Sequence, residues 1–150
     1  MTLAVDQLQV FIDSTRDYFS VSTGLDAEVG TPYLIESERP IVNEFTGLIG
    51  VSGVRKGCVY VTASKAMLKG MLVRMGVKTL GADEISDLVG EIANTISGAA
   101  RREFGGQFHI SVPIVVSGET DQVRLPKSIK CYAIPITWKS YNASLVIGLS

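Results

Sequence analysis

The pattern that most limits the fold of this chain lies between about residues 83 and 104, where apolar side chains recur every three or four positions. At about 100° per residue, this spacing places them on one arc of a helix. The residues of that arc are Ile85, Leu88, Val89, Ile92 and Ile96. Gly105 and Gly106 follow and predict the end of the helix. A helix with one such apolar stripe is stable only when a second layer of structure covers the stripe.

The opposite arc of the same helix carries Asp87, Glu91, Asn94 and Gly98, which fall within roughly 60° of one another. Asparagine is a poor helix former, and glycine costs about 1 kcal/mol relative to alanine in a helix. Small residues such as Gly98 and the nearby Gly90 let another backbone or side chain approach the helix closely. This face therefore indicates contact with another molecule, and an ordinary solvated surface is the alternative interpretation.

Helical and strand-like segments alternate along the rest of the chain. The expected helices span about residues 3–19, 64–75 and 83–104, and the expected strands span 28–35, 41–52, 58–62, 107–117, 129–138 and 143–149. Residues 53–57 form a tight connection, which predicts a hairpin. The order of segments predicts an α+β fold with a mostly antiparallel β-sheet and helices packed on one face, in a single domain of residues 1–150.

Several residues in the strand-like segments add detail to this prediction. Cys58 and Cys131 stand in apolar runs, which indicates reduced thiols buried in the core. Pro113 and Pro135 interrupt apolar runs and predict edge positions, bulges or strand starts. The strand at 143–149 ends without a charged residue, so we expect it to be an edge that could pair with another subunit.

Composition argues against several classes of function. The net charge is −1 with the two signs intermixed, which gives no basic surface for nucleic acid. The apolar runs are too short to cross a membrane, and the first residues lack the pattern of a signal peptide, so we expect a cytoplasmic protein. Two cysteines and one histidine, all far apart in the sequence, do not predict a metal site.

The acid–amide pattern resembles the signature of the CheC/CheX/FliY phosphatases, which act on the phosphorylated chemotaxis response regulator CheY. The resemblance lies in Asp87-x-x-x-Glu91-x-x-Asn94, the following Gly98 and the later Pro113. It extends upstream to the predicted hairpin at 47–62 and the helix after it. The chain contains one Glu-x-x-Asn motif only, which makes it most similar to CheX and implies a homodimer.

The resemblance implies a role for each residue of the motif. Asn94 would orient the water that attacks the aspartyl phosphate, and Glu91 would pair with the active-site lysine of the regulator. Asp87, Gly98 and Pro113 would support the site or bind the partner. Mg²⁺ would be held by the response regulator, and this chain would bind no cofactor or metal of its own.

A second interpretation gives the same helix no catalytic role. The domain would then be a non-catalytic interaction module for a response regulator or a flagellar switch, built on the same fold. Binding of the regulator without faster loss of its phosphate would distinguish this module from a phosphatase.

Overall fold

The computed structural model describes residues 3–118 and 123–150. Its helices are α1 (Val5–Thr23), α2 (Lys65–Arg74) and α3 (Ala82–Phe104). Its strands are β1 (Glu28–Val29), β2 (Tyr33–Ile35), β3 (Phe45–Gly53), β4 (Gly57–Ala63), β5 (Phe108–Ile110), β6 (Ile114–Ser117), β7 (Cys131–Trp138) and β8 (Tyr141–Leu149).

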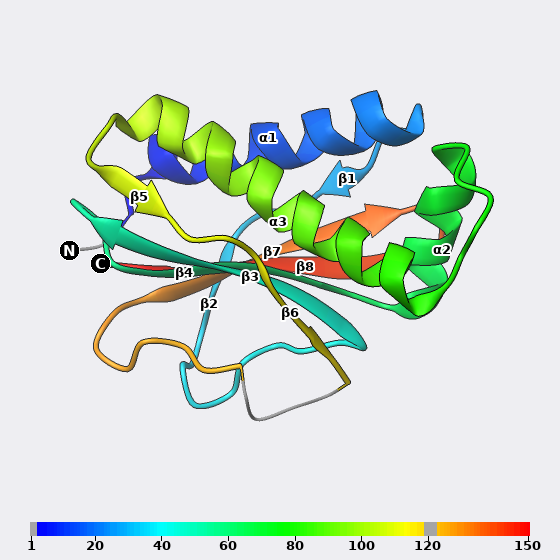
Figure 1. The fold of residues 1–150 in the computed structure, drawn as a ribbon. Coiled ribbons are helices and arrows are strands. Elements are labelled where there is room, and N and C mark those ends of the chain that lie inside the picture. The colour runs from blue at the N-terminus through cyan, green and yellow to red at the C-terminus, as the bar shows by residue number, and fades with distance from the viewer. Residues whose placement is uncertain (1–2, 119–122) are drawn as a thin grey trace.

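The strands form one antiparallel sheet in the order β1-β7-β8-β4-β3-β5, with β2 also paired to β7 and β6 also paired to β3. Figure 1 shows the helices gathered on one side of this sheet, with α1 and α3 side by side. The predicted fold class, a mostly antiparallel sheet with helices on one face, is confirmed. The hairpin predicted at 53–57 is also confirmed, since β3 and β4 pair directly across it.

The helix α1 is longer than predicted because its last turn is anchored to the sheet. The predicted helix ended near Phe19, whereas α1 continues to Thr23 and is capped by Gly24 at φ 71°. The indole Nε1 of the fully buried Trp138 donates to the Thr23 hydroxyl at 3.2 Å. This bond joins the end of α1 to β7, a contact that no local pattern in the sequence indicates.

Two predicted strands are each split in the structure. Segment 28–35 forms β1 and β2, which pair with β7 on either side of a gap at Gly30. Pro135 of β7 lies opposite that gap and accepts a hydrogen bond from the Gly30 N–H at 2.8 Å. Segment 107–117 forms β5 and β6, and between them the Ser111 hydroxyl accepts from the Gly50 N–H at 2.9 Å. Pro113 therefore lies between two strands and outside both.

Two further predictions differ from the structure: the residue at which one strand begins, and the strand that forms an edge of the sheet. The segment predicted from Ile41 enters the sheet only at Phe45. The final strand, predicted as an edge at 143–149, is the interior strand β8, hydrogen-bonded to β7 and β4 along its length. The prediction that it pairs with another subunit is therefore wrong, because both of its sides are occupied.

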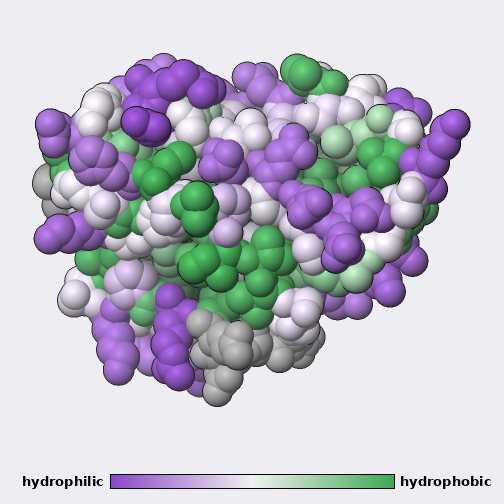
Figure 2. Space-filling view, viewed as in Figure 1, coloured by the Kyte–Doolittle hydropathy of each residue, from purple (hydrophilic) through white to green (hydrophobic). Residues whose placement is uncertain are grey.

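The strand β6 and the residues just before it expose apolar side chains to solvent. Val112, Ile114 and Val115 are 80%, 57% and 37% exposed, respectively. Figure 2 shows hydrophobic side chains gathered on the surface where Figure 1 places β6. Within the described residues, β5 and β6 pair with β3 alone, so this apolar stretch is also an open sheet edge.

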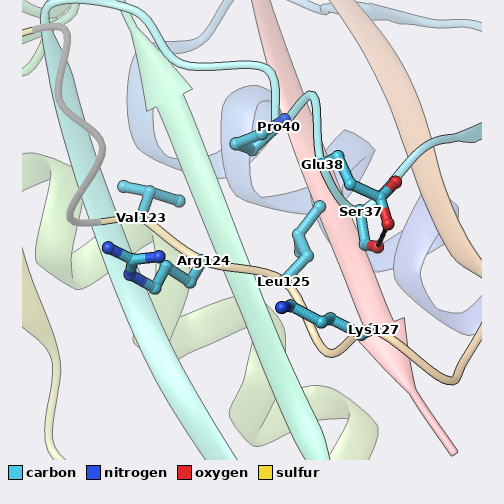
Figure 3. A pocket seen from close by; sticks show the side chains of 7 residues that line it. All are labelled: Ser37, Glu38, Pro40, Val123, Arg124, Leu125 and Lys127. Atoms are coloured by element: carbon cyan, nitrogen blue, oxygen red, sulfur yellow. Dashed lines mark hydrogen bonds between the residues drawn. The ribbon is translucent and has the colours of Figure 1, made fainter.

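A small cluster of buried apolar residues, separate from the larger core between the sheet and the helices, lies on the face of the sheet away from the helices. It contains Cys58, Tyr60 and Cys131, all buried beneath residues 36–44 and 123–130. Figure 3 shows the hollow between these two segments, about 360 Å³ in volume, with Pro40 and Leu125 on its walls. Cys58 and Cys131 both stand beside Gly148 of β8, and both are free, buried thiols as predicted.

This cluster predicts how the stability of the fold depends on pH. Burial, with a smaller effect from the neighbouring Cys131, raises the pKa of the Cys58 thiol from 9.0 to about 11. Burial also raises the pKa of Tyr60, whose hydroxyl donates a hydrogen bond to the Ile41 carbonyl at 2.7 Å. A pKa higher in the folded state than in the unfolded state contributes stability that is complete below the unfolded pKa and is lost as pH rises through the folded pKa.

We therefore expect the free energy of unfolding, measured by urea titration, to be steady up to about pH 9 and to fall as the pH rises toward 11. The variant Cys58→Ala lacks one of the titrating groups and should show a shallower fall over the same range. Equal free energies of unfolding at both ends of this range would contradict the prediction.

Candidate active site

The helix α3 is held at both ends by its own backbone and side chains. At its start, the Gly81 N–H donates to the Glu84 carboxylate at 3.1 Å. At its end, the Gly105 N–H donates to the Arg101 carbonyl, and Gly105 takes a positive φ of 96°. The predicted apolar arc is buried against the sheet and the other helices, which fixes the rotation of α3 about its axis. The face opposite that arc must therefore point outward.

Two glycines let α3 lie directly on the sheet. Gly47 of β3 faces the backbone of α3, and a Cβ atom there would collide with the Val89 carbonyl. Gly90 of α3 faces β6, where a Cβ atom would lie 3.2 Å from Val115 Cγ2 and 3.4 Å from Pro113 Cβ. The sequence indicated that small residues of this helix permit a close approach, and at Gly90 the partners of that approach are Pro113 and Val115.

The predicted motif residues lie together on the outward face of α3. Asp87, Glu91 and Asn94 are exposed, and Gly98 is half-buried. Glu91 and Asn94 are three residues apart and so stand on adjacent turns of the same helix face. Pro113 is exposed and lies beside Gly90, the residue before Glu91. The structure thus brings the five predicted residues to one side of the molecule.

The polar groups of Glu91 and Asn94 are free within the described part of the chain. The ion pairs found there join Arg16 to Asp13 and Arg39 to Glu36, and neither involves Glu91. Neither side chain takes part in a hydrogen bond among the described residues. Their acceptors and donors are therefore available to another molecule.

A groove of about 320 Å³ runs between α1 and α3 on one flank of this face. Its lining includes Tyr18 and Ser22 from α1 and Glu91 and Thr95 from α3. Burial and the nearby charge of Glu91 raise the pKa of Tyr18 to about 12. The sequence placed Tyr18 on the apolar face of the first helix and gave no sign that it shares a groove with the motif helix, because that groove depends on how the helices pack.

Two other kinds of site are not found in the described ranges. No helix among residues 3–118 and 123–150 combines the length and apolar character that a membrane crossing requires. Across the same residues, no group of three or more His, Cys, Asp and Glu side chains is placed to hold a metal ion. His109 is exposed on β5 with no such neighbours.

Solved structures with the same architecture place this fold among the CheC-like proteins. A CheC-like superfamily protein from Shewanella sp. PV-4 matches with a TM-score of 0.86 and 25% identity, covering 99% of each chain. The chemotaxis protein CheX from Vibrio vulnificus matches with a TM-score of 0.83 and 25% identity, covering 97% of this chain and 100% of the other. Comparison with curated proteins gives no match.

The family model for the chemotaxis phosphatase CheX matches residues 45–137, which include β3, α3 and the acid–amide motif. The chain belongs to the CheX family of chemotaxis phosphatases. A more distant structural match is CheX from Borrelia burgdorferi in a complex with CheY, BeF3 and Mg²⁺, with a TM-score of 0.80 and 14% identity over 97% of this chain and 99% of the other. At that identity the match concerns the fold.

The packing of α3 predicts opposite effects for two glycine substitutions. Gly47→Ala should lower the free energy of unfolding by about 1–3 kcal/mol or more, because the added methyl group meets backbone that cannot move aside easily. Gly98→Ala should raise it by up to about 1 kcal/mol, since an added Cβ there meets only Arg102 Nη1 at 3.9 Å. Urea titration measures both, and a Gly47→Ala variant as stable as the parent would show that α3 does not rest on β3.

Proposed function

We propose that this protein is a phosphatase that hydrolyses the aspartyl phosphate of a CheY-type response regulator, in chemotaxis or a related two-component pathway. The observation that carries the proposal is the exposed Glu91–Asn94 pair on α3, which has no partner within residues 3–118 and 123–150. Membership of the chemotaxis phosphatase family supports it. The Borrelia burgdorferi complex supports the choice of partner, because there a protein of this fold is assembled with CheY.

The chemistry assigned to Asn94 is the positioning of water. In the proposed reaction the water oxygen attacks phosphorus in line with the bond to the aspartate, that bond breaks, and inorganic phosphate and the free carboxylate are released. A primary amide suits this role, because its carbonyl accepts a hydrogen bond from the water while its NH₂ donates elsewhere, and it does not titrate. Positioning and charge stabilisation supply most of the catalysis in phosphoryl transfer.

Glu91 serves docking in this proposal. Its carboxylate would pair with the active-site lysine of the regulator and hold α3 at the entrance to the phosphorylated site. Asp87, one turn earlier, and Gly98, one turn later, would support that contact. The regulator would hold the Mg²⁺ ion that neutralises the phosphoryl oxygens, so the metal enters with the partner.

Pro113 and the apolar residues beside it would form the second part of the contact. Pro113 packs beside Gly90, so the exposed segment from Val112 to Val115 continues the outward face of α3 toward the sheet edge (Figure 2). Apolar surface of this kind adds affinity without disturbing the charges next to it. A homodimer also remains a prediction, and with β8 in the interior the β5–β6 edge is the open edge that this side of the sheet offers.

The substitution Asn94→Ala should remove the acceleration of phosphate release from the phosphorylated regulator while leaving the fold intact, because Asn94 is exposed and its side chain makes no hydrogen bond within the described residues. Phosphate release measured in the presence of Mg²⁺ is the assay, and circular dichroism is the check on folding. Thr95→Ala, at the next exposed position of the same helix, is the matched control and should keep its activity. Full activity of Asn94→Ala would remove this residue from the mechanism.

Glu91→Ala should act mainly on binding. Loss of a charge-assisted contact of about 1–3 kcal/mol corresponds to a KM for the phosphorylated regulator that is roughly 5-fold to 150-fold higher, with a much smaller change in kcat. Glu103→Ala removes an exposed carboxylate near the end of the same helix and should change neither constant. A similar rise in KM for both variants would indicate a general effect of charge.

The same measurements decide between the phosphatase and the non-catalytic module. Saturable binding of the regulator with no faster release of phosphate, in the parent protein, would identify an interaction module for a response regulator or a flagellar switch. Failure to bind or dephosphorylate any response regulator of the same organism would reject both proposals.

A further inference from the structure

Tyr18 holds a polar atom in an unusual position on the wall of the groove between α1 and α3. The residue is 5% exposed, and its hydroxyl has no hydrogen-bond partner among residues 3–118 and 123–150. The Ser22 hydroxyl lies near it without meeting hydrogen-bond geometry. Buried hydroxyl groups are nearly always paired, so an unpaired one beside a groove calls for an explanation.

Glu91 is the acidic residue that α3 contributes to the lining of this groove. The helices run antiparallel, as the packing of Phe11 near the start of α1 against Phe104 at the end of α3 shows, with ring centroids 6.1 Å apart. This arrangement brings the second half of α1 next to the part of α3 that carries the motif (Figure 1). Tyr18 and Glu91 both line the groove between the two helices. Burial and, to a smaller extent, the charge of Glu91 raise the pKa of Tyr18 to about 12, so the phenol is a hydrogen-bond donor at neutral pH, as an ordinary tyrosine also is.

We infer that Tyr18 is a positioning residue for Glu91, and this inference rests on the proposed function. The Tyr18 O–H donates to one carboxylate oxygen of Glu91 when the regulator docks, which leaves the other oxygen for the ammonium group of the partner's lysine. A carboxylate accepts at both oxygens, so the two bonds do not compete. The donor is then paired in the complex and unpaired only in the free protein.

The physical advantage lies in the side-chain entropy of Glu91. An exposed glutamate moves among many rotamers, and fixing it on binding costs affinity. Tyr18 is buried and rigid, so its hydroxyl offers the carboxylate one fixed position next to the docking face. Ser22 and Thr95 also line the groove, but they are less buried than Tyr18 and remain open to water, which would compete for the same bond.

The test is the variant Tyr18→Phe, assayed against the phosphorylated regulator and, for binding alone, against regulator loaded with Mg²⁺ and beryllofluoride. We expect KM and the dissociation constant to rise roughly threefold to tenfold with little change in kcat, as for the loss of one hydrogen bond. The thermal midpoint should stay unchanged or rise, because the hydroxyl has no partner in the free protein. Tyr33→Phe, on the exposed strand β2, is the matched control and should behave as the parent.

Combination with Glu91→Ala separates positioning from a general effect on the groove. Once Glu91 is absent, adding Tyr18→Phe should weaken binding no further, whereas independent effects would multiply. Unchanged binding by Tyr18→Phe in a parent that binds would overturn the inference and leave the proposed function standing, and so would a loss of stability without a change in KM. A parent protein that neither binds nor dephosphorylates the regulator would overturn the proposed function and this inference with it.

Discussion

The direct contact between the backbone of α3 and the strand β3 is the constraint on which the site depends. Gly47 leaves no room for a side chain between them, and Gly90 lets the Pro113 and Val115 side chains pack closely on the helix. With both contacts in place, the helix can neither roll nor lift, because its apolar arc is also buried. The backbone at Glu91 and Asn94 is therefore fixed on an exposed ridge, with α1 on one flank and the segment around Pro113 on the other. A catalytic group that acts by positioning water needs a support of this kind.

The local patterns of the sequence were enough to predict α3 closely. The structure begins this helix at Ala82, where Asp83 was expected, and ends it at Phe104 as predicted. The buried and exposed faces of α3 also agree with the periodicity, because apolar residues that recur about every 3.6 positions lie on one side of a helix. The motif residues could be placed on a common face for the same reason. Their chemical roles came from the family resemblance and remain to be measured.

Other features depended on contacts between distant segments, and no local pattern could supply them. The interior position of β8 follows from pairing with β4 and β7, and the apolar run of residues 145–149 does not indicate which strands lie on its two sides. The split of 107–117 depends on the bond between Ser111 and Gly50. Tyr18 belongs to the same category: its periodicity correctly predicted burial, but only the packing of α1 on α3 places it on the same groove as Glu91.

The bond between Trp138 and Thr23 has a practical consequence. Trp138 is the only tryptophan of the chain, and it is buried under the last turn of α1, with Phe19 and Tyr141 as aromatic neighbours. Its fluorescence is therefore an intrinsic optical signal for the seating of α1 on the sheet. Water reaching the indole would shift the emission to longer wavelength, so the spectrum would separate detachment of this helix from an event confined to the exposed ridge of α3.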